Sequence, residues 1–151
     1  MEHLHTGTSR PQRQRPELSI SLARNDSEIE DAQRLRFRVF AGEMGARLPS
    51  RIAGVDHDIY DPYCDHLIVR DERSNEVVGT YRILSPQNAR RLGGYYSENE
   101  FDLTRLQHLR GKLVEIGRAC VHPDYRRGAT ITLLWAGLAR YMIEGRHEHL
   151  I

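Results

Sequence analysis

The chain has 151 residues and a net charge of +1, so it has the length of one domain and lacks the strong charge of a polyanion-binding protein. Hydrophobic residues make up 39% and charged residues 28%, and no apolar run approaches the ~18 residues of a transmembrane helix. The arginines are dispersed, without a recognition helix or an aromatic platform, so no nucleic-acid partner is expected. Cys64 and Cys120 lack metal-site or disulfide-framework spacing, which favours a reducing cytoplasm.

Residues 1–16 are polar, contain Arg10, Arg13 and Arg15, and show no hydrophobic period, which predicts a disordered N-terminal arm. The three arginines could contact anionic lipid headgroups, at about 1 kcal/mol for each basic residue. They are fewer than a usual polybasic cluster, so an arm without a partner is the favoured interpretation. We expect the globular part to span residues 17–151.

A strand and a helix are predicted next along the chain. Leu18–Ala23 alternates apolar and polar residues, as a half-buried strand does. Ser27 and Glu30 have the spacing of a capping box, so a helix is expected to begin at Ser27 and to end near Gly42. Its apolar face is formed by Ile29, Ala32, Leu35, Val39 and Phe40.

Ala46–Tyr63 is a long irregular segment, and such segments in compact domains are usually functional or disordered. Its acidic residues allow two interpretations. They cap turns in a polar loop, or Asp58 and Asp61 bind the ammonium group of a cationic amino acid. His57 and the neighbouring acids lack the spacing of a metal site, so no metal is expected.

Two strands, His66–Arg70 and Val77–Leu84, are separated by turn-forming residues and predict an antiparallel hairpin. Arg82 lies inside the second strand, where its charge belongs either to a strand edge or to a binding site. The following connector, Pro86–Gly94, is polar and compatible with a short helix. Val114–Val121 is the next predicted strand.

Charged residues interrupt the strand Val114–Val121. Strict alternation places Glu115, Gly117, Ala119 and Val121 on one face, and Val114, Ile116, Arg118 and Cys120 on the other. Buried charges are costly unless they are paired or functional. Glu115 and Arg118 are therefore expected to form either structural ion pairs or part of an active site.

A turn over His122–Ala129 leads into a helix from Thr130 to about Gly145. The predicted apolar face of this helix holds Ile131, Leu134, Trp135, Leu138 and Met142. Its first N–H groups lack intrahelical acceptors, and the helix dipole adds partial positive charge there. The sequence therefore predicts a phosphate-binding turn, with an ordinary connection bearing solvated arginines as the alternative. The expected phosphate-binding residues are Arg126, Arg127, Gly128, Ala129, Thr130 and Ile131.

These motifs carry a resemblance to a known superfamily. Val121-x-Pro123-x-Tyr125-Arg126-x-Gly128 before an amphipathic helix resembles the pyrophosphate motif of the GNAT N-acyltransferases. The set Arg36-x-x-x-Phe40, Asp58-x-x-Asp61, Gly79-Thr80-Tyr81-Arg82 and Glu115-x-x-Arg118 is similar to the acyl-homoserine-lactone synthases. Val121–Arg126, Ala129–Ile131 and Leu134-Trp135 look more like the related ornithine acyl-ACP N-acyltransferases. Ala46 stands near a position where the lactone synthases often carry tryptophan.

The resemblance implies an α+β fold, an α/β/α sandwich in which a mixed, mostly antiparallel sheet is flanked by helices. His149–Ile151 looks like the start of a further strand, and the fold of the superfamily continues beyond this point. We therefore expect residues 17–151 to form the N-terminal and central part of a GNAT-like acyltransferase domain that is incomplete at its C-terminus.

The resemblance also implies a reaction. A 3-hydroxyacyl group would pass from acyl carrier protein, or from acyl-CoA, to the α-amine of ornithine and form lyso-ornithine lipid. Glu115 would be the catalytic base, directly or through a water. The substrate-binding residues would be Arg36, Phe40, Asp58, Asp61, Arg82 and Arg118. No permanently bound cofactor is implied, because acyl-phosphopantetheine is a co-substrate, and a lipid product suggests peripheral contact with the inner face of the membrane.

Two alternatives remain open on the same residues. The first is an acetyl-CoA-dependent N-acetyltransferase for a small amine, because the anion-binding turn suits either carrier. The second is a non-catalytic module that binds an acyl thioester or its carrier.

Overall fold

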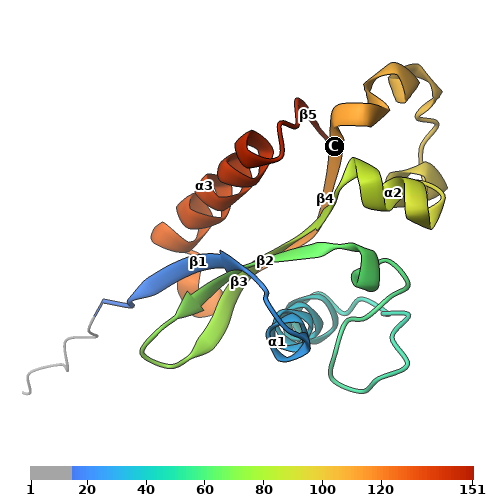
Figure 1. The fold of residues 1–151 in the computed structure, drawn as a ribbon. Helices are drawn as coiled ribbons and strands as arrows, with labels where there is room; N and C mark the ends of the chain where they lie inside the picture. The colour runs from blue at the N-terminus through green and yellow to red at the C-terminus, as the bar shows by residue number, and fades with distance from the viewer. Residues whose placement is uncertain (1–14) are drawn as a thin grey trace, which may run out of the picture.

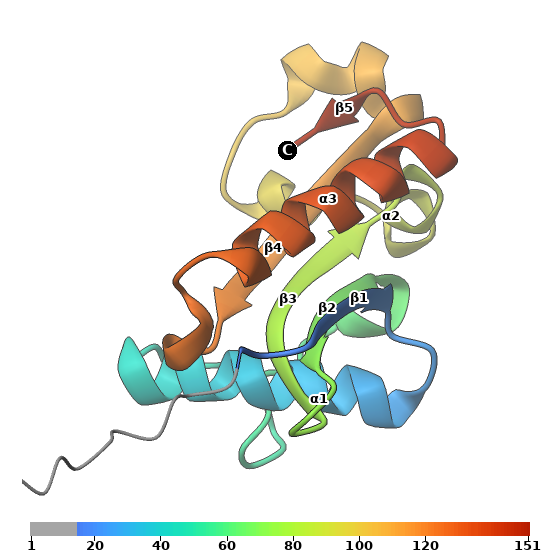
Figure 2. The ribbon, with the colours of Figure 1, turned by 90° about the vertical axis from the view of Figure 1, so that its left-hand side faces the viewer.

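The computed structural model describes residues 15–151 and shows a five-stranded sheet with helices on both faces (Figures 1 and 2). The strands follow the order of the chain: β1 (Leu18–Leu22), β2 (Asp65–Asp71), β3 (Glu76–Leu84), β4 (Leu113–Val121) and β5 (His149–Leu150). Apart from Arg15 and Pro16, the N-terminal arm predicted over residues 1–16 lies outside the described residues.

The strands β1 to β4 pair antiparallel, and β5 pairs parallel to β4. This confirms the predicted hairpin and the mixed, mostly antiparallel sheet of an α+β fold. The pairing with β5 covers only the beginning of β4, where Ile116 N–H donates to Ile151 O at 2.8 Å. Within residues 15–151, no strand pairs with the outer edge of β4 beyond Ile116. The sheet therefore has an open edge that begins beside Gly117.

The helix α1 (Asp26–Phe37) covers one face of the sheet and begins earlier than predicted. Asn25, not Ser27, is the N-cap: its side chain accepts from Glu28 N–H at 3.0 Å. Asn25 has extended backbone, which an N-cap needs, whereas Ser27 already lies inside the helix. A π-helical turn, η1 (Arg38–Glu43), extends the helix. The predicted apolar face is otherwise confirmed, since Ala32, Leu35 and Val39 are buried.

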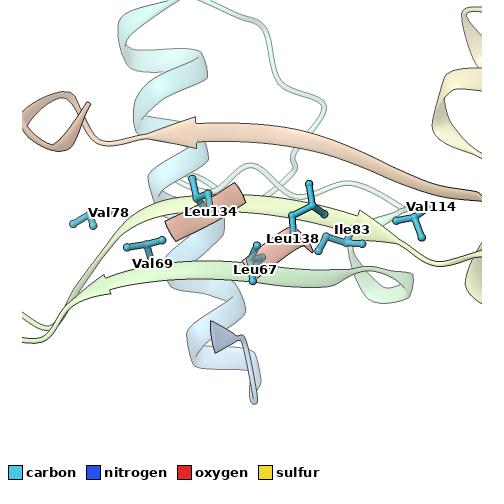
Figure 3. Close-up of a cluster of buried hydrophobic side chains, with 7 residues drawn as sticks. All are labelled: Leu67, Val69, Val78, Ile83, Val114, Leu134 and Leu138. Carbon is cyan, nitrogen blue, oxygen red and sulfur yellow. The ribbon is translucent and has the colours of Figure 1, made fainter. Parts of the chain in front are cut away.

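The helix α3 (Ala129–Glu144) packs on the opposite face through Leu134 and Leu138. Figure 3 shows these leucines among the buried side chains Leu67, Val69, Val78, Ile83 and Val114 of the strands. The predicted face of this helix is partly wrong, because Ile131 and Trp135 are 43% and 53% exposed. The face of α3 that packs against the sheet instead includes Thr130 and Gly137 beside Leu134 and Leu138.

Two glycines permit this close approach of α3 to the sheet. A Cβ atom on Gly79 of β3 would lie 2.7 Å from Thr130 Cγ2. A Cβ atom on Gly137 would lie 2.8 Å from Ile20 Cγ1 of β1. Both distances are shorter than a carbon–carbon contact allows, so the sheet and the start of α3 meet where side chains are missing.

Short helices form a lobe beside the first half of β4. They are α2 (Pro86–Leu92), which is capped by Ser85, η3 (Tyr96–Asn99) and η4 (Thr104–Lys112). Two further 3-10 helices lie elsewhere in the chain: η2 (Asp61–Tyr63) precedes β2, and η5 (Pro123–Tyr125) follows β4. Tyr95 is 3% exposed, and its hydroxyl donates to Leu113 O at 2.7 Å. This bond ties the lobe to β4 and places η3 beside Glu115.

Candidate active site

Three arginines and three aspartates form a buried ion-pair cluster beneath α1. Its members are Arg36, Arg82, Arg118, Asp56, Asp58 and Asp61. The Arg36 side chain has no exposed surface; its Nε donates to Asp56 Oδ2 at 3.0 Å and its Nη2 to Asp61 Oδ1 at 2.7 Å. Arg82 Nη1 donates to Asp58 Oδ1 at 2.7 Å. Buried charges are tolerated when they are compensated, so three charges of each sign allow the acidic loop to fold against the sheet.

The aspartates of this cluster point into the domain and are already partnered. Asp61 Oδ2 accepts from Asp58 N–H at 2.8 Å, and Asp58 Oδ2 accepts from Arg118 Nη2 at 3.3 Å. Burial acts to raise the pKa of Asp58, but the hydrogen bond and the charge of Arg82 outweigh it, so this pKa lies below its usual value. The arginines thus hold the acidic loop against the sheet.

Arg118 reaches the cluster because β4 contains a β-bulge. Arg118 and Ala119 together lie opposite Tyr81 of β3, and Arg118 has a φ of 50°, which is uncommon for a residue with a side chain. The strict alternation expected for this strand is therefore wrong beyond Gly117. Cys120 packs with the residues of α1 and Val121 with the core under α3, the reverse of the prediction.

Glu115 is 5% exposed and lies on the face of β4 that is turned away from α3. Its Oε2 accepts from Tyr96 N–H at 2.7 Å, and its Oε1 accepts from Ser97 N–H at 2.7 Å. The Ser97 hydroxyl donates to the same Oε1. A carboxylate has about four acceptor positions, and three of them are used here, so Glu115 anchors η3 and keeps one open position on Oε2.

A cavity of about 210 Å³ lies beside Glu115 at the open edge of β4. Its lining includes Tyr60, Tyr96, Ser97, Arg82, Arg118 and Gly117. The rings of Tyr60 and Tyr96 meet edge to face at 5.3 Å, and the guanidinium groups of Arg82 and Arg118 lie over them at 5.6 and 5.8 Å. Tyr60, Tyr96 and Ser97 are not among the site residues that the sequence predicted. Their place in the chain carries no local pattern that links them to Glu115.

The turn before α3 presents backbone donors at the far end of β4. Gly128 is the N-cap residue with a φ of 103°, and no side chain caps the first turn of the helix. Arg127, Gly128 and Ala129 are exposed, as the predicted phosphate site requires. Thr130 is 1% exposed and Ile131 is 43% exposed, so the side chain of Thr130 packs into the domain and that of Ile131 does not.

The two arginines of this turn differ in their contacts. Arg126 Nε donates to Val121 O at 3.1 Å, and its Nη2 donates to Glu43 Oε2 at 2.7 Å. Arg126 therefore fastens the turn to the end of η1. Arg127 stays exposed beside the uncapped N–H groups, where an anion could be held.

Phe40, the remaining predicted substrate-binding residue, is half-buried and packs against the apolar cluster between α1 and the sheet. It lies at the π-helical turn that precedes the acidic loop, and Ala46 N–H donates to Phe40 O at 2.9 Å. Phe40 thus supports the start of this loop.

The chain matches a known protein family over most of the region that builds this cavity. The sequence profile of the family described as "Acetyltransferase (GNAT) domain" matches residues 35–136, which is more than half of the chain. The chain belongs to the GNAT acetyltransferase family. The match includes Arg36, the acidic loop, Glu115 and the turn before α3.

The chain is similar to proteins whose names state the acceptor of the acyl group. It is 41% identical over 143 residues to a protein named L-ornithine N(alpha)-acyltransferase from Agrobacterium fabrum, covering 89% of this chain and 49% of that protein. A protein of the same name from Rhodobacter capsulatus is 41% identical over 142 residues, covering 87% of this chain and 53% of the relative. The GNAT chain spans about half the length of the curated relatives that it matches.

A solved structure has the same fold as the GNAT chain. The AHL synthase LasI aligns with a TM-score of 0.62 and 20% sequence identity, covering 89% of this chain and 71% of that one. This likeness concerns the fold, and it confirms the architecture expected from the sequence.

Both cysteines of the GNAT chain are poor nucleophiles. Burial raises the pKa of the Cys64 and Cys120 thiols to about 12. A thiol with such a pKa is protonated at neutral pH, and the thiolate is the reactive form. Cys64 lines the cavity beside Glu115, yet it offers no thiolate for a covalent intermediate.

Proposed function

We propose that the protein transfers a 3-hydroxyacyl group from acyl carrier protein to the α-amine of ornithine, which yields lyso-ornithine lipid. The relatives named L-ornithine N(alpha)-acyltransferase support this choice of acceptor. The observation that supports the chemistry most directly is the position of Glu115. It lines a small cavity at the edge where β4 loses its pairing with β5.

In this proposal, the thioester arm runs along the open edge of β4. The uncapped N–H groups at Ala129–Ile131 and the exposed Arg127 bind the phosphate at one end. Val121 lies six positions after Glu115 on β4, and because the bulge at Arg118 shortens the strand by one step, the distance along the strand is about 17 Å. An extended arm that follows this edge brings its thioester to the cavity, because Gly117 leaves space there.

Glu115 receives the proton of the amine, and we assign Ser97 a part in this transfer. The ammonium of the acceptor gives a proton to Ser97 Oγ, whose own proton passes to Glu115 Oε1. The free amine then attacks the thioester carbonyl and forms the C–N bond. The C–S bond breaks, the nitrogen loses a proton, and the departing sulfur takes up a proton and leaves as the thiol. Direct transfer to the open position on Glu115 is the simpler variant of the same chemistry.

Arg118 is the proposed ligand of the acceptor carboxylate. Its side chain is 22% exposed, whereas that of Arg82 is 6% exposed, and both line the cavity. Asp58 and Asp61 are compensated by arginines, so in this proposal they position the guanidinium groups. Arg36 and Phe40 hold the loop that carries these acids.

The proposal is tested by supplying the protein with ornithine and one acyl donor at a time, and by following N-acylornithine by mass spectrometry. A 3-hydroxyacyl carrier protein is expected to be consumed with ornithine. Consumption of acetyl-CoA with a small amine would instead support an N-acetyltransferase. Binding of the acyl carrier without any product would identify a carrier-binding module.

A further inference from the structure

In the loop between η1 and η2, the acidic side chains point into the domain and the arginine side chains point outward. The loop projects from the α1 side of the sheet in both views (Figures 1 and 2). Its acids Asp56 and Asp58 are turned inward and are paired with the buried arginines. Its own arginines, Arg47 and Arg51, are exposed, and neither forms an ion pair within residues 15–151. The outer surface of the loop is therefore basic, although its sequence contains as many acids as arginines.

Apolar side chains share this outer surface. Ile52 is 59% exposed and Ile59 is 72% exposed. Together with Leu48 and Pro49, and with both arginines, they line one hollow of about 960 Å³. Asp58 also lines this hollow, but its carboxylate is paired with Arg82 and Arg118. Large aliphatic side chains that gather beside arginines without a partner are typical of surfaces that enter the headgroup region of an anionic bilayer.

The hollow borders the cavity beside Glu115. Tyr60, Tyr96 and Arg118 line both spaces. An amphiphile formed in the small cavity would thus lie next to the apolar side chains on the outer surface of the loop. No helix within residues 15–151 is long and apolar enough to cross a bilayer.

We propose that the outer surface of this loop, formed by Arg47, Leu48, Pro49, Arg51, Ile52 and Ile59, is a docking site for an anionic phospholipid bilayer. Ile52 and Ile59 enter the boundary between headgroups and acyl chains, and Arg47 and Arg51 bind lipid phosphates. The charge complementarity of the loop with anionic lipid favours this partner over a second copy of the chain, whose matching surface would be equally basic. The inference goes beyond the proposed reaction and does not require activity.

Sedimentation with vesicles tests the docking site on the intact chain. Binding is expected to phosphatidylcholine vesicles that contain phosphatidylglycerol, and to be much weaker to phosphatidylcholine alone. The Arg47→Gln/Arg51→Gln variant should lower the partition coefficient about 30-fold, as expected for two basic contacts at a lipid surface. The Ile52→Ser/Ile59→Ser variant should lower it on the order of tenfold or more, because partition follows the apolar area that is buried.

Matched variants elsewhere on the surface complete the experiment. Arg91→Gln/Arg105→Gln removes two exposed arginines from α2 and η4, and Ile143→Ser removes an isoleucine that is 77% exposed on α3. Both controls should bind as the wild type does, and all variants should keep their thermal unfolding temperature. The inference is overturned if the loop variants bind normally. It is equally overturned if Arg10→Gln/Arg13→Gln alone abolishes binding, or if the isoleucine variant only separates a dimer in sedimentation velocity.

Discussion

Arg36 Nη2 donates to Asp61 Oδ1 at 2.7 Å, and neither side chain is more than 2% exposed. This pair joins α1 to the end of the acidic loop across 25 residues of sequence. The same guanidinium also holds Asp56 through Nε. The position of the loop, and with it the cavity beside Glu115, depends on a charge that lies wholly inside the domain.

Replacing Arg36 with methionine should lower the free energy of unfolding by roughly 3–5 kcal/mol, because Asp56 and Asp61 would keep buried charges without their main partner. Urea unfolding followed by circular dichroism measures this loss. Arg34→Ala is the matched control on the same helix. Its pair with Glu30 is solvent-exposed, so the change should stay within about 0.5 kcal/mol. An equal effect of both substitutions would contradict a buried structural role for Arg36.

Gly79→Ala should destabilise the domain by about 1–3 kcal/mol, because the added methyl group overpacks the contact between β3 and α3. Its Cβ would lie 2.7 Å from Thr130 Cγ2 and 3.2 Å from Leu134 Cδ1. The double variant Gly79→Ala/Thr130→Ser removes the nearer methyl group and should recover part of the loss. Gly42→Ala is the control, since nothing lies within 4 Å of its Cβ position. If Gly79→Ala is as harmless as Gly42→Ala, then α3 does not approach the sheet as described.

His66 should make the domain less stable at mildly acidic pH. Burial lowers the pKa of His66 below its ordinary value of 6.5, and Arg36 and Arg82 add to this effect, although Asp61 opposes it. Between the lowered pKa and 6.5, the unfolded chain binds more protons than the folded chain. The contribution is therefore complete above pH 6.5 and is lost as the pH falls toward the folded pKa.

Urea unfolding at a series of pH values measures this slope. His66→Gln should flatten the pH dependence below 6.5, and the prediction fails if the slope is the same in both proteins.

A second loss of folding stability is expected at lower pH, because of Asp58. Its folded pKa lies below 3.8, so its stabilisation is present above 3.8 and is lost as the pH falls through the folded value.

Ser97→Ala should lower kcat on the order of 100-fold, as expected for the loss of a proton-transfer group. KM for ornithine should change little, because the hydroxyl is not proposed to bind the carboxylate. Ser97→Thr keeps a hydroxyl and should restore most of the rate, while Ser21→Ala on the exposed side of β1 serves as a control. Unchanged kcat with an unchanged pH profile in Ser97→Ala would assign proton transfer to Glu115 alone.

Several parts of the fold and the site were predictable because their signals are local. The alternation of Leu18–Leu22 and the turn residues before Glu76 identify the first strands and the hairpin. The motif around Gly128 identifies the uncapped start of α3, because the glycine and the helix lie next to each other in the chain. The predicted start of α1 was wrong because Asn25, instead of Ser27, is the N-cap. Both residue types are favoured at this position, and only the backbone conformation distinguishes them.

By itself, the sequence determined the hairpin, the turn before α3 and the charged residues that the structure brings together around the cavity. The tertiary structure alone decided their arrangement: the bulge that swings Arg118 toward Asp58, the hydrogen bonds from Ser97 to Glu115, and the inward direction of the loop acids. The physical reason is distance along the chain. Arg118 and Asp58 are 60 residues apart, so the energy of their pairing arises only once the sheet and the loop have folded together.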